Sequence, residues 1–156
     1  DTDIDFADGD IILDGEIIND KIRTPEISKA ASLYSAIPEV REKLVEIQRK
    51  MGMRKSVIMD GRDIGTVVLP NAQVKIFLTA SPEERAKRRY EELTQKGEKV
   101  SYEKVLQDMI ARDKQDSERA IAPLKQAADA VLLDTSGDTV EQSVNAILDI
   151  VRRKLG

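Results

Sequence analysis

The chain has 156 residues, of which 40% are hydrophobic and 35% charged, and its formal net charge at pH 7 is −4; that length favours one domain with room for a small appended subdomain. The sequence has neither Cys nor His, which excludes disulfides, thiolate chemistry and the usual base and metal ligand. The negative charge argues against a general nucleic-acid binder, and no apolar run approaches the roughly 20 residues of a membrane span, so we expect a soluble, cytoplasmic protein.

Three short apolar segments come first, separated by Asp-Gly pairs. Asp-Gly between apolar runs is a strong hairpin signal, so we expect a small antiparallel sheet of three strands over residues 3–6, 10–13 and 16–18. Thr24-Pro25-Glu26 then predicts a helix that begins with a hydroxyl cap and a proline in the first turn. A second helix is expected from Pro38, with apolar residues at helical spacing until Gly52 ends it.

The second half alternates predicted strands and helices. A helix capped by Ser81, with Glu84 as its capping-box partner, should run toward Gly97. Another should start near Ser101 and end before Pro123, and the last should start at about Thr139. Buried strands are expected over residues 56–60, 74–78 and 130–133. Strands that alternate with helices in this way predict an α/β fold with a parallel sheet.

The most informative segment is Asp60-Gly61-Arg62-Asp63, which follows the first of these predicted strands. The carboxyl end of a parallel strand is where open α/β sheets bind their ligands. Arg62 could bind a phosphate through two parallel hydrogen bonds. Asp63 could accept from the amino group of cytosine, whereas uracil would present a carbonyl to the same carboxylate. A salt bridge within the turn explains the local pattern equally well.

A second group of charges lies near the end of the predicted helix that starts at Ser101. Arg112, Asp116 and Arg119 are spaced by four and three residues, which places them on one helical face. Two guanidiniums beside a carboxylate suit a ligand with a phosphate and sugar hydroxyls. Phosphoryl transfer also suits an enzyme limited to Arg, Lys, Asp, Glu and hydroxyl groups. An ordinary solvated ladder of ion pairs is the other interpretation, and spacing alone favours it.

The basic run over residues 85–89 could screen a triphosphate. A solvent-facing basic surface balanced by nearby glutamates explains the same run, and spacing alone favours that explanation. No cluster of carboxylates with metal-ligand spacing stands clear of basic neighbours, so no protein metal site is predicted.

Several segments follow the pattern of one known family: Asp60 to Pro70, Lys75 to Ser81, Glu84-Arg85-Ala86 with Arg88-Arg89, Arg112-Asp113 with Asp116, Arg119 and Pro123-Leu124, and upstream Ile22-Arg23-Thr24, Ala30-Ala31-Ser32 and Ile37 to Arg41. Together these segments resemble the bacterial cytidylate kinases, in collinear order over essentially all 156 residues.

The resemblance implies a P-loop nucleoside monophosphate kinase fold, in which residues 1–53 form the monophosphate-binding insert. Residues 54–156 would be the core, with a lid over about 85–120. The family transfers the γ-phosphoryl group of ATP to CMP or dCMP with Mg²⁺, and a monomer is the simplest expectation.

The resemblance also implies roles for single residues around the nucleotide base and ATP. Ser32, Arg41 and Asp63 would read the cytosine ring. Arg88, in the lid, would approach ATP.

Further roles concern the reacting phosphates. Arg62 and Arg119 would grip the CMP phosphate, with Arg112 and Asp116 near the ribose or the transferring phosphoryl group. The three arginines would therefore be the catalytic residues, acting by positioning and charge neutralisation.

One departure from the family pattern matters. Such kinases begin with a strand and a Gly-x-x-x-x-Gly-Lys-Ser/Thr loop that cradles the donor phosphates, and this sequence has no such motif. We expect a longer protein whose amino-terminal part is not represented, with a true truncation as the alternative, and no kinase activity from these residues alone. Two other functions stay open: a non-catalytic cytidine-nucleotide-binding module, and a helical interaction module resting on helices 38–51 and 139–154.

Overall fold

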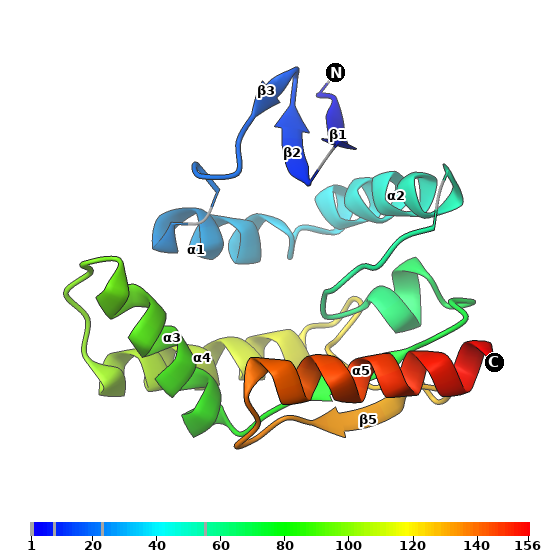
Figure 1. Ribbon diagram of the computed structural model, residues 1–156. Coiled ribbons are helices and arrows are strands. Elements are labelled where there is room, and N and C mark those ends of the chain that lie inside the picture. Colours follow the sequence, from blue (N-terminus) through cyan, green and yellow to red (C-terminus); the bar gives the residue numbers. More distant parts are fainter. Residues whose placement is uncertain (1, 8, 23, 55) are drawn as a thin grey trace. The chain divides into compact units, whose positions relative to one another are not determined.

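The computed structural model describes residues 2–7, 9–22, 24–54 and 56–156 (Figure 1). They form an α/β structure that divides into two compact units, Asp1–Leu44 and Val45–Gly156. The boundary falls inside the second helix.

The first unit opens with the predicted antiparallel sheet. Its strands are β1 (Ile4–Ala7), β2 (Asp10–Leu13) and β3 (Glu16–Ile17), in the order β1-β2-β3. The Asp14-Gly15 turn has φ of 49° and 83°, a left-handed conformation that glycine and aspartate tolerate best. The three-stranded sheet is thus confirmed. Asp8, in the other predicted turn, lies outside the described residues.

Two helices follow, α1 (Pro25–Tyr34) and α2 (Pro38–Arg54). Thr24 caps α1 as predicted, because its side chain accepts a hydrogen bond from the Ile27 amide at 3.2 Å. The prediction that Gly52 ends α2 is wrong. A Cβ at Gly52 would lie 3.0 Å from Leu69 Cδ2, so the missing side chain permits close packing inside the helix.

The second unit contains a parallel pair, β4 (Ile76–Thr79) and β5 (Val131–Asp134), with Ile76 opposite Val131. The predicted strand over residues 56–60 is wrong. No described residue pairs with this segment as a strand, and Ile58 is fully exposed. Apolar composition alone does not make a strand, because a strand needs a hydrogen-bonded neighbour.

Helices α3 (Pro82–Gln95) and α4 (Tyr102–Glu118) pack against each other to form the main apolar cluster of the second unit. The cluster is built on Ala86, Leu93 and Val105. Tyr90 and Tyr102 meet edge to face at its margin, with ring centroids 6.2 Å apart, which is a favourable aromatic geometry.

The cap of α3 differs from the prediction in one respect. Ser81 Oγ accepts from the Glu84 amide at 3.2 Å, as expected. The Ser81 amide, however, donates to Ser136 Oγ at 2.8 Å instead of to the Glu84 side chain. The start of α3 is therefore tied to the loop after β5, which sequence spacing did not indicate.

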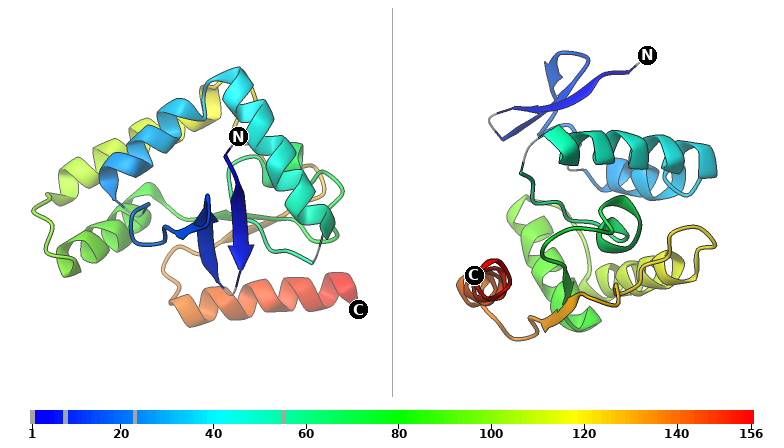
Figure 2. Two further views of the ribbon diagram at one scale, coloured as in Figure 1. Left: turned by 90° about the horizontal axis from the view of Figure 1, so that it is seen from above. Right: turned by 90° about the vertical axis from the view of Figure 1, so that its right-hand side faces the viewer.

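The last helix, α5 (Val140–Leu155), has the full capping box between Thr139 and Gln142. It runs back in the direction opposite to β5 (Figure 1) and is seen along its axis in the right-hand view of Figure 2. Ile150 is its buried residue, whereas Val140, the first of the expected apolar stripe, is 81% exposed. Among the described residues, no helix is long and apolar enough to cross a membrane.

Candidate functional site

The Arg62-Asp63 segment leads into a π-helical turn, η1 (Ile64–Val68). The Asp63 carbonyl accepts from the amides of Val67 and Val68 at 2.8 and 3.2 Å, and Leu69 N donates to Ile64 O at 2.7 Å. Such i→i+5 turns are rare and often occur at functional sites. Gly61 permits this geometry, because a Cβ there would lie 2.9 Å from the Ile64 side chain.

Asp116, on α4, is the centre of the charged cluster. Its Oδ2 lies 3.1 Å from Arg62 Nε and 4.0 Å from Arg112 Nε, and its Oδ1 lies 3.5 Å from Arg119 Nη1. The Asp116 side chain is only 10% exposed. A carboxylate so buried needs compensating charges, and three guanidiniums supply them.

Arg119 reaches this cluster from outside the helix, contrary to the prediction of a shared helical face. α4 ends at Glu118, and Arg119 is its extended C-cap residue. The following segment folds back, since the Leu124 amide donates to the Asp116 carbonyl at 2.8 Å and Arg119 Nε donates to the Ala122 carbonyl.

Arg119 also connects the two predicted charge groups. Its Nη2 lies 3.8 Å from Asp63 Oδ2, and both side chains are largely buried, at 15% and 12% exposure. The π-helical turn and the end of α4 therefore share one cluster. Arg62 pairs with Asp116 and Asp63 pairs with Arg119, so both residues of the segment have partners at the end of α4.

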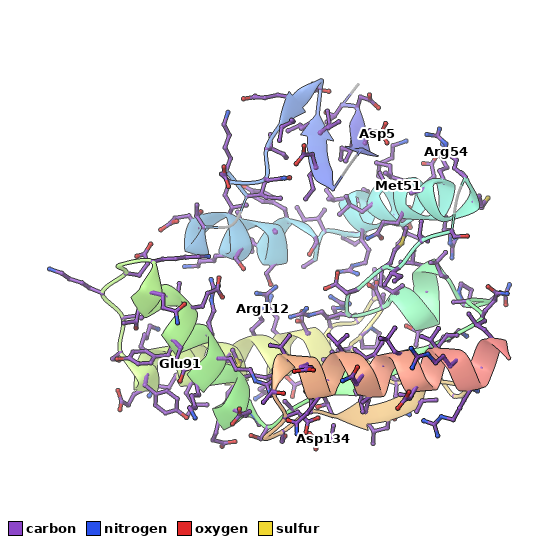
Figure 3. The ribbon with its side chains drawn as sticks, in the orientation of Figure 1. Asp5, Met51, Arg54, Glu91, Arg112 and Asp134 are labelled. Carbon is purple, nitrogen blue, oxygen red and sulfur yellow. The ribbon has the colours of Figure 1, made fainter. Side chains whose placement is uncertain are left out.

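Three guanidiniums and two carboxylates make this cluster net positive. A guanidinium has five N–H donors in a rigid fork. Arg62 uses Nε on Asp116, and its side chain is 43% exposed. Arg112 is similarly exposed at 42% and extends from α4 (Figure 3). These donors suit bidentate binding of a phosphate.

Two predicted site residues lie in the first unit. Ser32 is on α1, where its carbonyl accepts from Ser35 Oγ at 3.3 Å. Arg41 is buried on α2. The unit of Val45–Gly156 holds the remaining predicted residues.

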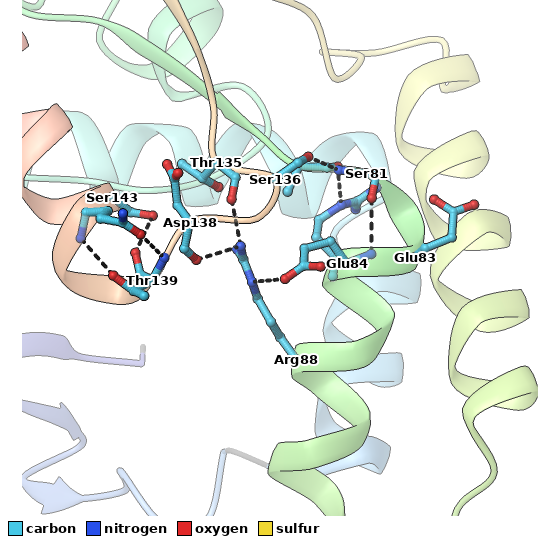
Figure 4. A network of polar contacts seen from close by, with 12 residues as sticks. Ser81, Glu83, Glu84, Arg88, Thr135, Ser136, Asp138, Thr139 and Ser143 are labelled. Atoms are coloured by element: carbon cyan, nitrogen blue, oxygen red, sulfur yellow. Dashed lines mark hydrogen bonds and ion pairs between the residues drawn. The ribbon is translucent and has the colours of Figure 1, made fainter.

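Arg88, on α3, lies in a separate network of polar contacts (Figure 4). Its Nη2 donates to the carbonyls of Thr135 and Asp138 at 2.7 and 3.4 Å, and its Nε lies 3.5 Å from Glu84 Oε1. Arg88 thus links α3 to the loop after β5. The same loop carries Ser136, whose hydroxyl and amide lower the pKa of the Asp134 carboxyl by hydrogen bonding.

Comparison with known proteins places these features in one family. The family model described as cytidylate kinase matches residues 1–153. The chain belongs to the cytidylate kinase family. It is 53% identical over 151 residues to a cytidylate kinase of Thermosipho africanus, covering 97% of this chain and 68% of the relative. A cytidylate kinase of Clostridioides difficile is 52% identical over 147 residues, with 94% and 68% covered. The resemblance drawn from the sequence, and with it a nucleoside monophosphate kinase, is confirmed.

One contact between α3 and α4 was not predicted from the sequence. Arg85 on α3 makes a bidentate pair with Asp113 on α4, with Nη1–Oδ1 and Nη2–Oδ2 distances of 3.0 and 2.6 Å. Its Nε donates to the Ala80 carbonyl at 3.0 Å. Residue spacing does not indicate this contact, because the partners are 28 residues apart. Arg85, the first residue of the basic run, therefore has a carboxylate partner in Asp113. Such a pair is what a structural role for the run would produce.

No described part of this chain offers a metal centre. The described residues contain no group of three or more Asp or Glu side chains that could hold an ion. Asp63 and Asp116 face guanidiniums instead. The carboxylates of the cluster thus organise cations of the protein and do not fit a resident Mg²⁺.

Proposed function

We propose that this chain supplies the acceptor site of an enzyme that transfers the γ-phosphoryl group of ATP to CMP or dCMP, which gives ADP and CDP or dCDP. The observation that carries the proposal is the convergence of three guanidiniums on the buried carboxylate of Asp116. Such a cluster binds anions in a fixed orientation. Family membership supplies the nucleotide class.

In this proposal Arg62 and Arg119 bind the CMP phosphate, and Arg112 lies toward the phosphoryl group in transit. Asp116 holds all three guanidiniums in one place and lies near the ribose. No covalent intermediate is needed, because phosphoryl transfer depends on positioning and on neutralising charge at the equatorial oxygens. The side chains of Arg62 and Arg112 are partly exposed, which suits contact with a substrate.

The cytosine ring would be read by Asp63 together with Ser32 and Arg41. Asp63 suits this role chemically, since a carboxylate accepts from the 4-amino group of cytosine and repels the 4-carbonyl of uracil. The neighbouring guanidinium of Arg119 lies 3.8 Å from the Asp63 carboxylate. Ser32 and Arg41 are assigned from the family resemblance alone.

ATP would bind on the side of Arg88, within a lid over about residues 85–120 of a P-loop kinase core spanning 54–156. Residues 1–53 would be the monophosphate-binding insert. Mg²⁺ would arrive with ATP, whose phosphates are its ligands. Closure over both nucleotides would limit ATP hydrolysis by water. A monomer is the simplest functional state.

The 156-residue chain should bind CMP without turning it over, because its sequence has no Gly-x-x-x-x-Gly-Lys-Ser/Thr loop to cradle ATP. Calorimetry should show tighter binding of CMP than of UMP, and Arg62→Gln should weaken both. Arg152→Gln, on the exposed side of α5, is the matched control and should change neither. Equal binding of the two nucleotides, or no loss in Arg62→Gln, would count against the acceptor site. CMP-dependent formation of ADP would contradict the expected inactivity.

A non-catalytic module that binds cytidine nucleotides is the alternative. It predicts the same CMP preference, with no kinase activity even when a P-loop segment is supplied in the same chain. A helical interaction module predicts no effect of any nucleotide on the melting temperature.

A further inference from the structure

Arg49, on α2, contacts the end of the π-helical turn. Its Nε donates to the Val68 carbonyl at 3.1 Å, and its Nη2 donates to the Val67 carbonyl at 2.6 Å. All three residues belong to the unit Val45–Gly156. The guanidinium therefore spans the last two carbonyls of η1 with one rigid fork.

These two carbonyls need a partner from elsewhere in the chain. The last carbonyls of a helix point away from it without intrahelical donors, and they carry partial negative charge. A cation with forked donors satisfies both needs at once. Arg49 is thus the cap of η1, in place of the glycine or backbone motif that usually ends a helix.

The same two residues connect Arg49 to the charged cluster. The amides of Val67 and Val68 donate to the carbonyl of Asp63, and their carbonyls accept from Arg49. A shift of the turn at its Arg49 end therefore moves the backbone of Asp63. The neighbouring Arg62 would move with it.

A second contact places the same face of α2 against the turn. Gly52 lies one helical turn after Arg49, and a Cβ there would be 3.0 Å from Leu69 Cδ2. Leu69 is the C-cap residue of η1. Hydrogen bonds and close packing thus act on the same end of the turn.

We propose that Arg49 is a positioning residue for the cytosine-reading turn. It holds the carboxyl end of η1 so that Asp63 and Arg62 face Arg119 and Asp116 in the orientation that discriminates cytosine from uracil. This inference rests on the proposed acceptor site. A purely structural role would change stability without changing the preference for CMP over UMP.

The test uses the full chain with Arg49→Gln and Arg49→Lys. Calorimetry with CMP and UMP should show the affinity ratio falling about tenfold in Arg49→Gln, the worth of one hydrogen bond to a charged group. Arg49→Lys should recover part of the ratio, because an ammonium keeps the charge but lacks the rigid planar fork of a guanidinium. The matched control is Arg153→Gln, which removes an exposed arginine whose Nε donates to a carbonyl of its own helix at 3.2 Å. It should leave the ratio unchanged.

Amide hydrogen exchange without nucleotide supplies the second readout. Exchange at Val67, Val68 and Leu69 should be faster in Arg49→Gln than in the wild-type chain and unchanged in Arg153→Gln. A wild-type CMP-to-UMP ratio in Arg49→Gln overturns the inference, whatever its stability. If the wild-type chain itself does not prefer CMP, the proposed function fails. Amide exchange then tests by itself whether Arg49 anchors η1: faster exchange in Arg49→Gln supports the anchoring, and unchanged exchange refutes it.

Discussion

Replacing Asp116 with asparagine should destabilise the second unit, because three guanidiniums would lose their shared counter-charge. Asparagine keeps the shape and one acceptor oxygen of the side chain, so the change isolates the charge. Arg119 is the most affected partner, since its side chain is 15% exposed and cannot turn fully to water. The destabilisation therefore reports directly on whether Asp116 organises the cluster.

The expected size follows from the burial of each partner. Breaking a buried ion pair by removing one member costs about 3–5 kcal/mol, and the Asp116–Arg119 pair belongs to that class. Arg62 and Arg112, at 43% and 42% side-chain exposure, can be hydrated and should each add about 0–1 kcal/mol. Arg119 keeps Asp63 at 3.8 Å, which favours the lower end. We expect a loss of about 3 kcal/mol, or about 10 °C in melting temperature.

Urea unfolding followed by near-ultraviolet circular dichroism measures this loss, because the packed pair Tyr90 and Tyr102 reports on the second unit. Asp149→Asn is the matched control, since its pair with Arg152 has side chains 65% and 74% exposed. That control should change the free energy of unfolding by less than about 0.5 kcal/mol. An equally small change in Asp116→Asn would refute the reasoning.

Three other outcomes are expected. Lys75→Gln should raise the pKa of the Asp129 carboxyl, which hydrogen bonding to Lys75 now lowers, and carboxyl titration by NMR should show the shift. A lowered pKa stabilises the folded chain at pH values above the ordinary pKa, and that stabilisation is lost as the pH falls through the lowered pKa. The variant should therefore lose less stability than the wild-type chain below about pH 4. Arg85→Gln and Asp113→Asn should each cost about 1 kcal/mol and couple in a double-mutant cycle, whereas additive losses would mean the bidentate pair contributes nothing. Asp63→Ala should abolish the preference for CMP over UMP in calorimetry, and unchanged affinities would remove Asp63 from that role.

Local signals in the sequence predicted the helix starts well. Thr24 and Ser81 cap their helices as expected, and the helices expected to start near Ser101 and Thr139 begin there, with those residues as N-caps. A cap depends only on a hydroxyl and an amide three residues away. The predicted end of α2 at Gly52 was wrong for a different reason. Gly52 packs closely against Leu69 inside the helix instead of ending it.

Predictions that needed a distant partner fared less well. The segment 56–60 has strand-like composition but no paired neighbour among the described residues. The π-helical turn is defined by amides that donate to the carbonyl five residues earlier. No residue pattern in the sequence predicted this hydrogen bonding. Arg85 and Arg49 find their partners across 28 and about 19 residues, beyond the reach of spacing arguments.

By itself the sequence determined the α/β class, the helix starts and the residue types available for chemistry, because each of these depends on composition or on neighbours a few positions apart. Its resemblance to known proteins over the whole chain determined the family. Only the tertiary structure decided that Arg62 and Asp63 meet Asp116 and Arg119. It did so by ending α4 before Arg119 and folding the following segment back on Asp116. Arg62 and Asp116 are 54 residues apart in the sequence, and packing and backbone hydrogen bonds bring them together. Residue spacing along the chain gives no information about either.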